Sequence, residues 1–188
     1  ACFYLGCHFN APTPDQRYQF PWHTGDRCNS DFAIPSTIED REKVLSLFDQ
    51  SANIWGGADD FVSKNIYAHL AMQHALKLPA DTLRRATLID KAFSCAERAA
   101  PHYAEAALTL ASFYLKNPRG HDASLTQTRA YEWVKKADEM PNTGGEASYR
   151  RSVHLINGIG IESDPPSAAR YLRKAADAGN VIAVATLV

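Results

Sequence analysis

The sequence lacks an excess of charge of either sign, and it lacks any long apolar run. Twenty Lys and Arg residues stand against 21 Asp and Glu residues, so the formal net charge is −1. Short basic clusters such as Arg150-Arg151 alternate with acidic residues, which is typical of solvated helix faces. No apolar segment approaches the roughly 20 residues that a membrane-spanning helix requires. We therefore expect neither a nucleic-acid partner nor a membrane-spanning helix.

The sequence also lacks the motifs that mark common active sites and metal sites. It contains no G-x-S-x-G nucleophile motif, no phosphate-binding P-loop and no His-Glu-x-x-His zinc motif. His69 and His74 are five residues apart, so they would not share a helix face. Surface or capping roles are expected for His102, His121 and His154, which have no cysteine or carboxylate at ligand spacing. We expect no enzyme activity, no metal and no cofactor.

Cysteine is scarce, and three of the four cysteines, Cys2, Cys7 and Cys28, lie in the first 28 residues. Their spacing does not form the close C-x-x-C pairs of a zinc site. A disulfide between Cys7 and Cys28 would imply an oxidising compartment such as the periplasm, and free thiols are the alternative. Cys95 lies in an alanine-rich helical pattern and is expected to be a small buried thiol.

The first seven residues are apolar and contain small residues, and they resemble the end of a bacterial lipoprotein signal. The resemblance implies a lipid on Cys2 or on Cys7, and a lipidated cysteine could not also form a disulfide. Cys2 is our choice for the lipidated residue. This hypothesis places the protein in the bacterial periplasm or cell envelope, attached to the membrane only through the lipid. The alternatives are an ordinary buried amino-terminal segment and a cytoplasmic location.

Residues 1–35 are expected to be irregular, because proline interrupts helices and this segment contains Pro12, Pro14, Pro21 and Pro35. A helical domain is expected to follow over residues 36–188. It opens with a capping-box pattern at residues 36–39, and Gly56-Gly57 ends its first helix. Further helices are predicted at 61–78, 81–100, 104–116, 124–139, 145–157 and 164–178. No segment shows sustained alternation of apolar and polar residues, so the predicted fold class is all-α.

Two windows of the helical region repeat one pattern. The first helices align at an offset of 41 residues (147 minus 106), and the second helices at 38 (168 minus 130). Small residues recur in equivalent places, with Ala106, Ala130 and Ala137 matching Ala147, Ala168 and Ala175. Repeats of this length are typical of helical-hairpin arrays.

The turns of the later window have a simple physical basis. Gly158 and Gly160 permit the reversal of the backbone between two helices. Asp164 is expected to cap the next helix, and Pro165 suits its first turn. Gly179 is expected to end that helix.

The later window resembles the Sel-one-like repeat, a relative of the tetratricopeptide repeat, at Gly158-x-Gly160, Asp164, Ala168, Tyr171, Lys174-Ala175-Ala176, Gly179 and Ala183. It departs from that pattern at Arg151-Ser152, where the family prefers Leu-Gly. The resemblance covers residues 61–188 and implies a right-handed α-solenoid of helical hairpins. It also implies that the first helix of each hairpin lines a concave binding face. On this basis the candidate partner-binding residues are Ser112, Phe113, Tyr149, Arg150 and His154, which should point away from the hairpin core.

The resemblance further implies a protein-protein interaction module. Sel-one-like proteins scaffold complexes, and bacterial examples include envelope lipoproteins and immunity proteins that neutralise type VI secretion effectors such as lipases. The leading hypothesis is an envelope immunity or inhibitor protein that binds an antibacterial effector. The alternative is a regulatory or assembly scaffold of an envelope or secretion complex.

The apolar residues 181–188 begin another first helix and stop without a polar cap. This pattern indicates either that the chain is truncated at Val188 or that a partner or second copy covers the apolar end.

Overall fold

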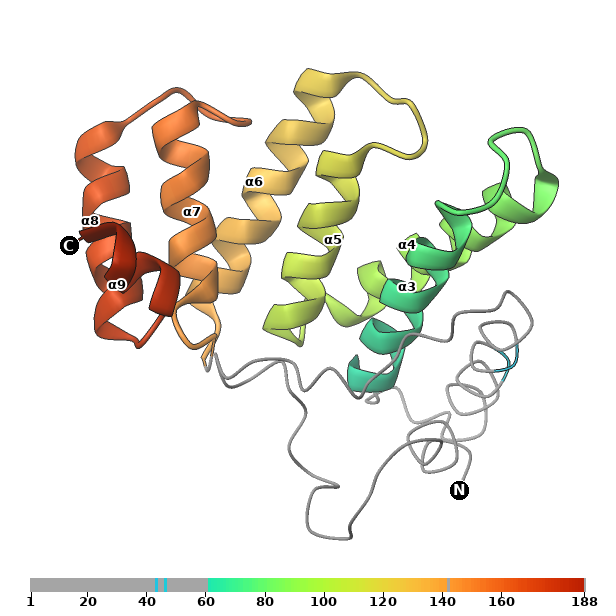
Figure 1. The fold of residues 1–188 in the computed structure, drawn as a ribbon, viewed down its shortest axis with the longest axis horizontal. Coiled ribbons are helices and arrows are strands. Elements are labelled where there is room, and N and C mark those ends of the chain that lie inside the picture. Colours follow the sequence, from blue (N-terminus) through green and yellow to red (C-terminus); the bar gives the residue numbers. More distant parts are fainter. Residues whose placement is uncertain (1–42, 44–45, 47–60, 142, 188) are drawn as a thin grey trace, which may run out of the picture. The chain divides into compact units, whose positions relative to one another are not determined.

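The computed structural model describes Lys43, Ser46 and residues 61–141 and 143–187, and every regular element in these residues is an α-helix (Figure 1). The helices are α3 (Phe61–Ala75), α4 (Leu83–Ala99), α5 (Ala104–Lys116), α6 (Ala123–Glu139), α7 (Glu146–Asn157), α8 (Pro165–Asp177) and α9 (Val181–Leu187). The all-α prediction is confirmed for this part of the chain. The predicted irregular segment lies outside the described residues, as does the first predicted helix apart from Lys43 and Ser46.

The chain divides into two compact units, residues 1–95 and 96–188. In the first unit, α3 buries a stripe of small and apolar residues at helical spacing, namely Ala68, Ala71, Met72 and Ala75. In α4, the corresponding buried stripe is Ile89, Ala92 and Phe93. Both helices lie within the ranges that the sequence predicted, 61–78 and 81–100.

The second unit consists of consecutive helices that pack on their neighbours in the chain. Helix α5 packs on α6 and α7 packs on α8, and both pairs run antiparallel (Figure 1). Helix α6 also contacts α7, and α8 contacts the short helix α9. The unit is therefore a row of helices in which each packs mainly on the preceding and the following one.

Small side chains are buried throughout this row. Ala106, Ala130, Ala137, Ala147 and Ala175 have no exposed surface, and Ala168 is 3% exposed. A methyl side chain adds little volume at a helix crossing, so the two backbones can approach closely. All six alanines of the repeated pattern lie in the packed interior.

Side-chain caps fix several helix starts. Asp164 accepts a hydrogen bond from the Ser167 backbone N–H at 3.1 Å, and Pro165 is the first residue of α8, as predicted. Thr82 directly precedes α4, and its hydroxyl accepts a bond from the Arg85 backbone N–H at 3.3 Å.

Gly160 has a second role besides its turn conformation. Its φ of +72° is the left-handed conformation that favours glycine, in agreement with the predicted turn. A methyl group at this position would lie 2.1 Å from the Gln127 carbonyl oxygen and 2.7 Å from the Thr128 nitrogen. The loop between α7 and α8 therefore packs directly on the backbone of α6, with no room for a side chain.

We predict that Gly160→Ala lowers the free energy of unfolding by about 3 kcal/mol, from left-handed strain plus steric overlap. Gly120→Ala is the matched control, because Gly120 has a φ of +67° and no atom within 4 Å of an added methyl group. This control should lose only about 1 kcal/mol from conformational strain. Equal losses in denaturant unfolding would show that the contact with α6 contributes nothing.

Candidate interaction surface

The candidate residues come from α5 and α7, the first helices of the two pairs. Each helix buries one face and exposes the other. On α5 the less buried positions Glu105, Thr109 and Ser112 follow one another at helical spacing. On α7 the less buried positions include Tyr149 and Arg150. Three of the five candidates, Ser112, Tyr149 and Arg150, therefore lie on partly exposed faces, as predicted.

Arg150 and Ser112 meet across the two helices, although 38 residues separate them in the sequence. Arg150 Nη1 donates to Ser112 Oγ at 2.9 Å and lies 3.4 Å from the Leu108 carbonyl oxygen. Ser112 in turn donates its hydroxyl hydrogen to the same carbonyl at 2.9 Å. The Arg150 guanidinium on α7 is thus held against α5 at Leu108 and Ser112.

Glu146 extends this hydrogen-bonded chain toward α9. Its Oε1 accepts from Arg150 Nε at 2.6 Å, and its Oε2 accepts from Asn180 Nδ2 at 3.2 Å. Asn180 is itself the cap of α9, because its Oδ1 accepts from the Ala183 backbone N–H at 3.0 Å. Polar side chains therefore connect α5, α7 and α9 in one continuous chain.

Two donor groups on this surface remain available to a partner. Arg150 uses Nε and Nη1 within the protein, whereas its Nη2 has no partner among the described residues. A guanidinium has five N–H donors, so the two on Nη2 are left for solvent or a ligand. The hydroxyl of Tyr149 likewise makes no hydrogen bond within the described part of the chain, and the side chain is partly exposed.

The expectation that Phe113 and His154 point away from the hairpin core is wrong. Phe113 is 2% exposed and His154 is 4% exposed. Phe113 continues the buried stripe that Ala106 and Leu110 begin on α5, at the i, i+4, i+7 spacing of one helix face. His154 lies seven residues after Ala147 and shares its buried face on α7. Neither side chain offers a surface to a partner in this conformation.

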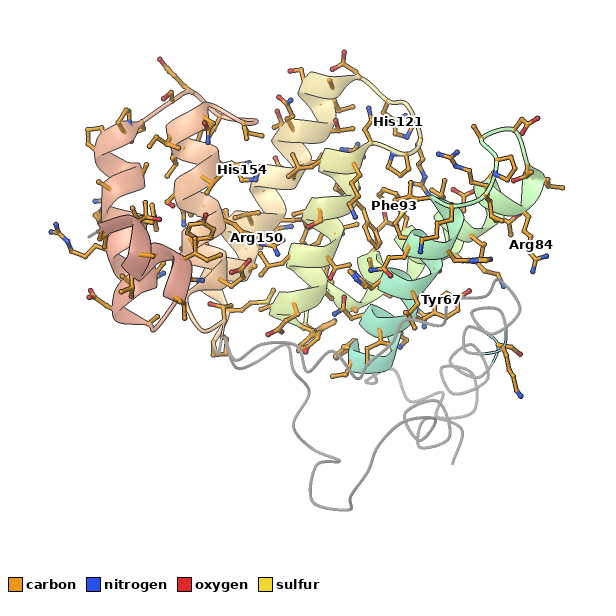
Figure 2. All side chains as sticks on the ribbon, viewed as in Figure 1. Tyr67, Arg84, Phe93, His121, Arg150 and His154 are labelled. Carbon is orange, nitrogen blue, oxygen red and sulfur yellow. The ribbon has the colours of Figure 1, made fainter. Side chains whose placement is uncertain are left out.

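His154 stabilises the loop that follows α7. Its Nδ1 lies 2.8 Å from the Ile159 carbonyl oxygen, and its ring centroid lies 5.9 Å from that of Tyr131 on α6. In the neutral form Nδ1–H donates to this carbonyl. Burial lowers the pKa of His154 and nearby Arg150 lowers it further, although the hydrogen bond to Ile159 acts in the opposite direction. Figure 2 shows His154 one turn beyond Arg150 on α7.

A second polar cluster joins α6, α7 and α8 around Asp138, whose side chain is 3% exposed. The carboxylate accepts from Arg151 Nη1 at 3.0 Å, from Lys174 Nζ at 2.8 Å and from the Ser148 hydroxyl. The Arg151 guanidinium also stacks 4.2 Å from the centre of the Tyr171 ring. Burial raises the pKa of Asp138, but hydrogen bonds from Lys174, Ser148 and Arg151 outweigh this effect and bring the pKa below its ordinary value.

This cluster corrects the view of Arg150-Arg151 as a solvated basic pair. The Arg151 side chain is only 13% exposed, and it occupies the position where the Sel-one-like pattern has leucine. The sequence did not identify Asp138 as the partner of Arg151 or Glu146 as the partner of Arg150. The only available signal was the i, i+4 spacing of Glu146 and Arg150, which is typical of an ion pair on a helix.

The remaining predicted residues lie outside the described part of the chain. They are Cys2, proposed for lipidation, and Cys7 and Cys28, proposed as a disulfide. Cys95, in α4, is partly buried rather than buried as expected.

Among the described residues, no group of three or more His, Cys, Asp or Glu side chains is arranged to hold a metal ion. No described helix combines the length and the apolar character needed to cross a membrane. No protein-family model and no curated protein matches this sequence.

We predict that Asp138→Ala lowers the free energy of unfolding by about 3 kcal/mol, because Arg151 would remain largely buried without its carboxylate. Asp177→Ala serves as the control, since Asp177 is an exposed carboxylate at the end of α8. It should change stability by less than about 0.5 kcal/mol. A loss for Asp138→Ala no larger than that of the control, in chemical denaturation, would contradict a role for this cluster in stability.

The pH dependence of stability should reveal His154. The folded pKa lies below the ordinary value, so the unfolded chain binds this proton more readily. The contribution of His154 is therefore complete above its ordinary pKa of about 6.5 and is lost as the pH falls below it. We expect His154→Asn, which retains a donor near Ile159, to flatten the stability curve between pH 7 and 5. An unchanged slope, measured against the wild-type curve, would exclude His154 as a source of this pH dependence.

Proposed function

We propose that residues 61–187 belong to a right-handed α-solenoid of Sel-one-like helical hairpins, with the two pairs α5–α6 and α7–α8 as successive repeats. Helix α7 begins 42 residues after α5 (146 minus 104), and α8 begins 42 residues after α6 (165 minus 123). The equivalent alanines of the two pairs are buried in the same way. These alanines are 41 residues apart in the first helices and 38 apart in the second helices. A repeat of about 40 residues with matching buried alanines supports this interpretation.

We propose that this module binds another protein through the outer face of α5 and α7. The observation that carries the proposal is the arrangement at residues 149–150. A partly exposed tyrosine adjoins an arginine whose orientation is already fixed by Ser112 and Glu146. Tyr and Arg are enriched among the residues that dominate binding energy in protein interfaces. An arginine that is already ordered loses less conformational entropy when a partner binds.

For the partner, we propose an antibacterial effector toxin, which this protein would neutralise as an envelope immunity or inhibitor protein. This assignment rests on the Sel-one-like resemblance and on the lipoprotein-like start. It involves no reaction and no cofactor, because binding alone would block the effector. The alternative assignment is a regulatory or assembly scaffold of an envelope or secretion complex, which would use the same surface.

The two assignments differ in what the protein does for the cell. If it is an immunity protein, expression should rescue cells from a toxin encoded beside its gene, and the two proteins should copurify. A scaffold would copurify with several components of a complex and would rescue no cell from a toxin. Growth of cells that express the neighbouring toxin, with and without this protein, distinguishes these outcomes.

We predict that Tyr149→Ala weakens partner binding at least tenfold while the helical content stays unchanged, because the partly exposed ring supplies contact area to a partner. Leu125→Ala is the control, since Leu125 is 50% exposed and belongs to α6 rather than to α5 or α7. The measurement is calorimetric titration with the copurified partner. Unchanged affinity for Tyr149→Ala would move the interface away from α7.

A further inference from the structure

The outward side of α7 carries an apolar stripe beside its polar residues. Tyr149, Val153 and Ile156 follow one another at the i, i+4, i+7 spacing of one helix face, and none of them is buried. Ile156 is 59% exposed. An amphipathic helix at a protein surface normally carries polar residues on this side. The opposite side of α7 packs in the interior through Ala147 and Leu155. Within the stripe, Ile156 is mostly uncovered, whereas Tyr149 and Val153 are partly buried and keep part of their surface open.

The stripe is flanked by groups that donate hydrogen bonds and carry positive charge. Arg150 lies on one flank; its side chain is 38% exposed, and its Nη2 has no partner among the described residues. Both carboxylate oxygens of Glu146 are engaged, one by Arg150 and one by Asn180, so they do not offer acceptors to a partner. Lys116 is exposed on α5, one turn beyond the Ser112 that contacts Arg150. The flank of the stripe therefore presents donors outward.

We propose that the face formed by Tyr149, Val153, Ile156 and Arg150 binds a segment of the protein partner that combines apolar side chains with a carboxylate. The apolar side chains would cover the stripe, and the carboxylate would accept from Arg150 Nη2. This inference rests on the proposed function and specifies the chemistry of the partner.

Charge favours one carboxylate over a polyanion. The Arg150–Glu146 pair is neutral as a whole, and Lys116 shares its face of α5 with Glu105, so this surface carries no excess of positive charge. A nucleic acid or a phosphate group needs several cations that are not already paired. One carboxylate satisfies the free Nη2 donors without requiring a second cation. The apolar stripe then supplies the part of the interface that excludes water.

The test uses the full chain and the partner isolated in the copurification experiment. Ile156→Asp should reduce affinity at least tenfold, because it places a charge on the apolar stripe. Leu125→Asp, at a comparably exposed position on α6, should leave affinity within twofold. Arg150→Gln should also reduce affinity at least tenfold, and this loss should exceed that of Ser112→Ala, which removes the internal bond but keeps Nη2. Thermal unfolding of each variant shows which of them retain the fold.

A glutamine and asparagine scan of the acidic residues of the partner identifies the carboxylate. Replacing that carboxylate in the partner should weaken binding to the wild-type chain tenfold. The same replacement should cause no further loss of affinity for the Arg150→Gln variant. If a partner binds and rescue is intact but Ile156→Asp and Arg150→Gln bind normally, the inference about this face is overturned while the proposed function stands. If no protein copurifies with the wild-type chain, the proposed function fails and this inference fails with it.

Discussion

The close approach of helix backbones is the constraint on which the second unit depends. Buried alanines permit it between helices, and Gly160 permits it where the loop after α7 meets α6. At such positions the space between backbones is too small for a larger residue, so the register of each helix on the next is fixed by sterics. Polar contacts that demand accurate placement, such as the bond between Arg150 and Ser112, become possible only because this register is fixed.

Two polar assemblies then distinguish the two sides of α7. On one side, the chain from Ser112 through Arg150 and Glu146 to Asn180 connects α5, α7 and α9 and remains partly accessible to solvent. On the other side, Asp138 gathers Arg151, Ser148 and Lys174 in a largely buried cluster. Adjacent arginines therefore have different roles. Arg150 keeps donors that no described residue accepts from, whereas Arg151 joins the packed cluster of α6, α7 and α8.

Local signals in the sequence predicted the helices well. Asp164-Pro165 marked the start of α8, and Gly158 and Gly160 marked the turn before it, because capping and positive φ depend on residues close in the chain. The burial of Arg151 could not be predicted in the same way. Its carboxylate partner is 13 residues away on another helix, and the pair forms only when α6 and α7 pack.

The candidate site shows the same limit. Tyr149 and Arg150 were correctly placed on an accessible face, but the resemblance alone could not assign Phe113, which is rotated by about 100° from Ser112 on the helix. The buried spacing of Ala106 and Leu110 contained the signal that Phe113 faces inward. Ser112 and Arg150 are 38 residues apart in the sequence. Their contact could be recognised only from the arrangement of α5 and α7.

The position of Asp138 has a consequence for how this region unfolds. In a row of helices where each touches only its neighbours, terminal helices ordinarily fray one after another. The Asp138 carboxylate binds side chains of both α7 and α8. If either helix detaches, the same buried charge is exposed. Local opening of α8 alone is therefore penalised, so α6, α7 and α8 should exchange their backbone amide hydrogens as one cooperative block, whereas α9 can open independently.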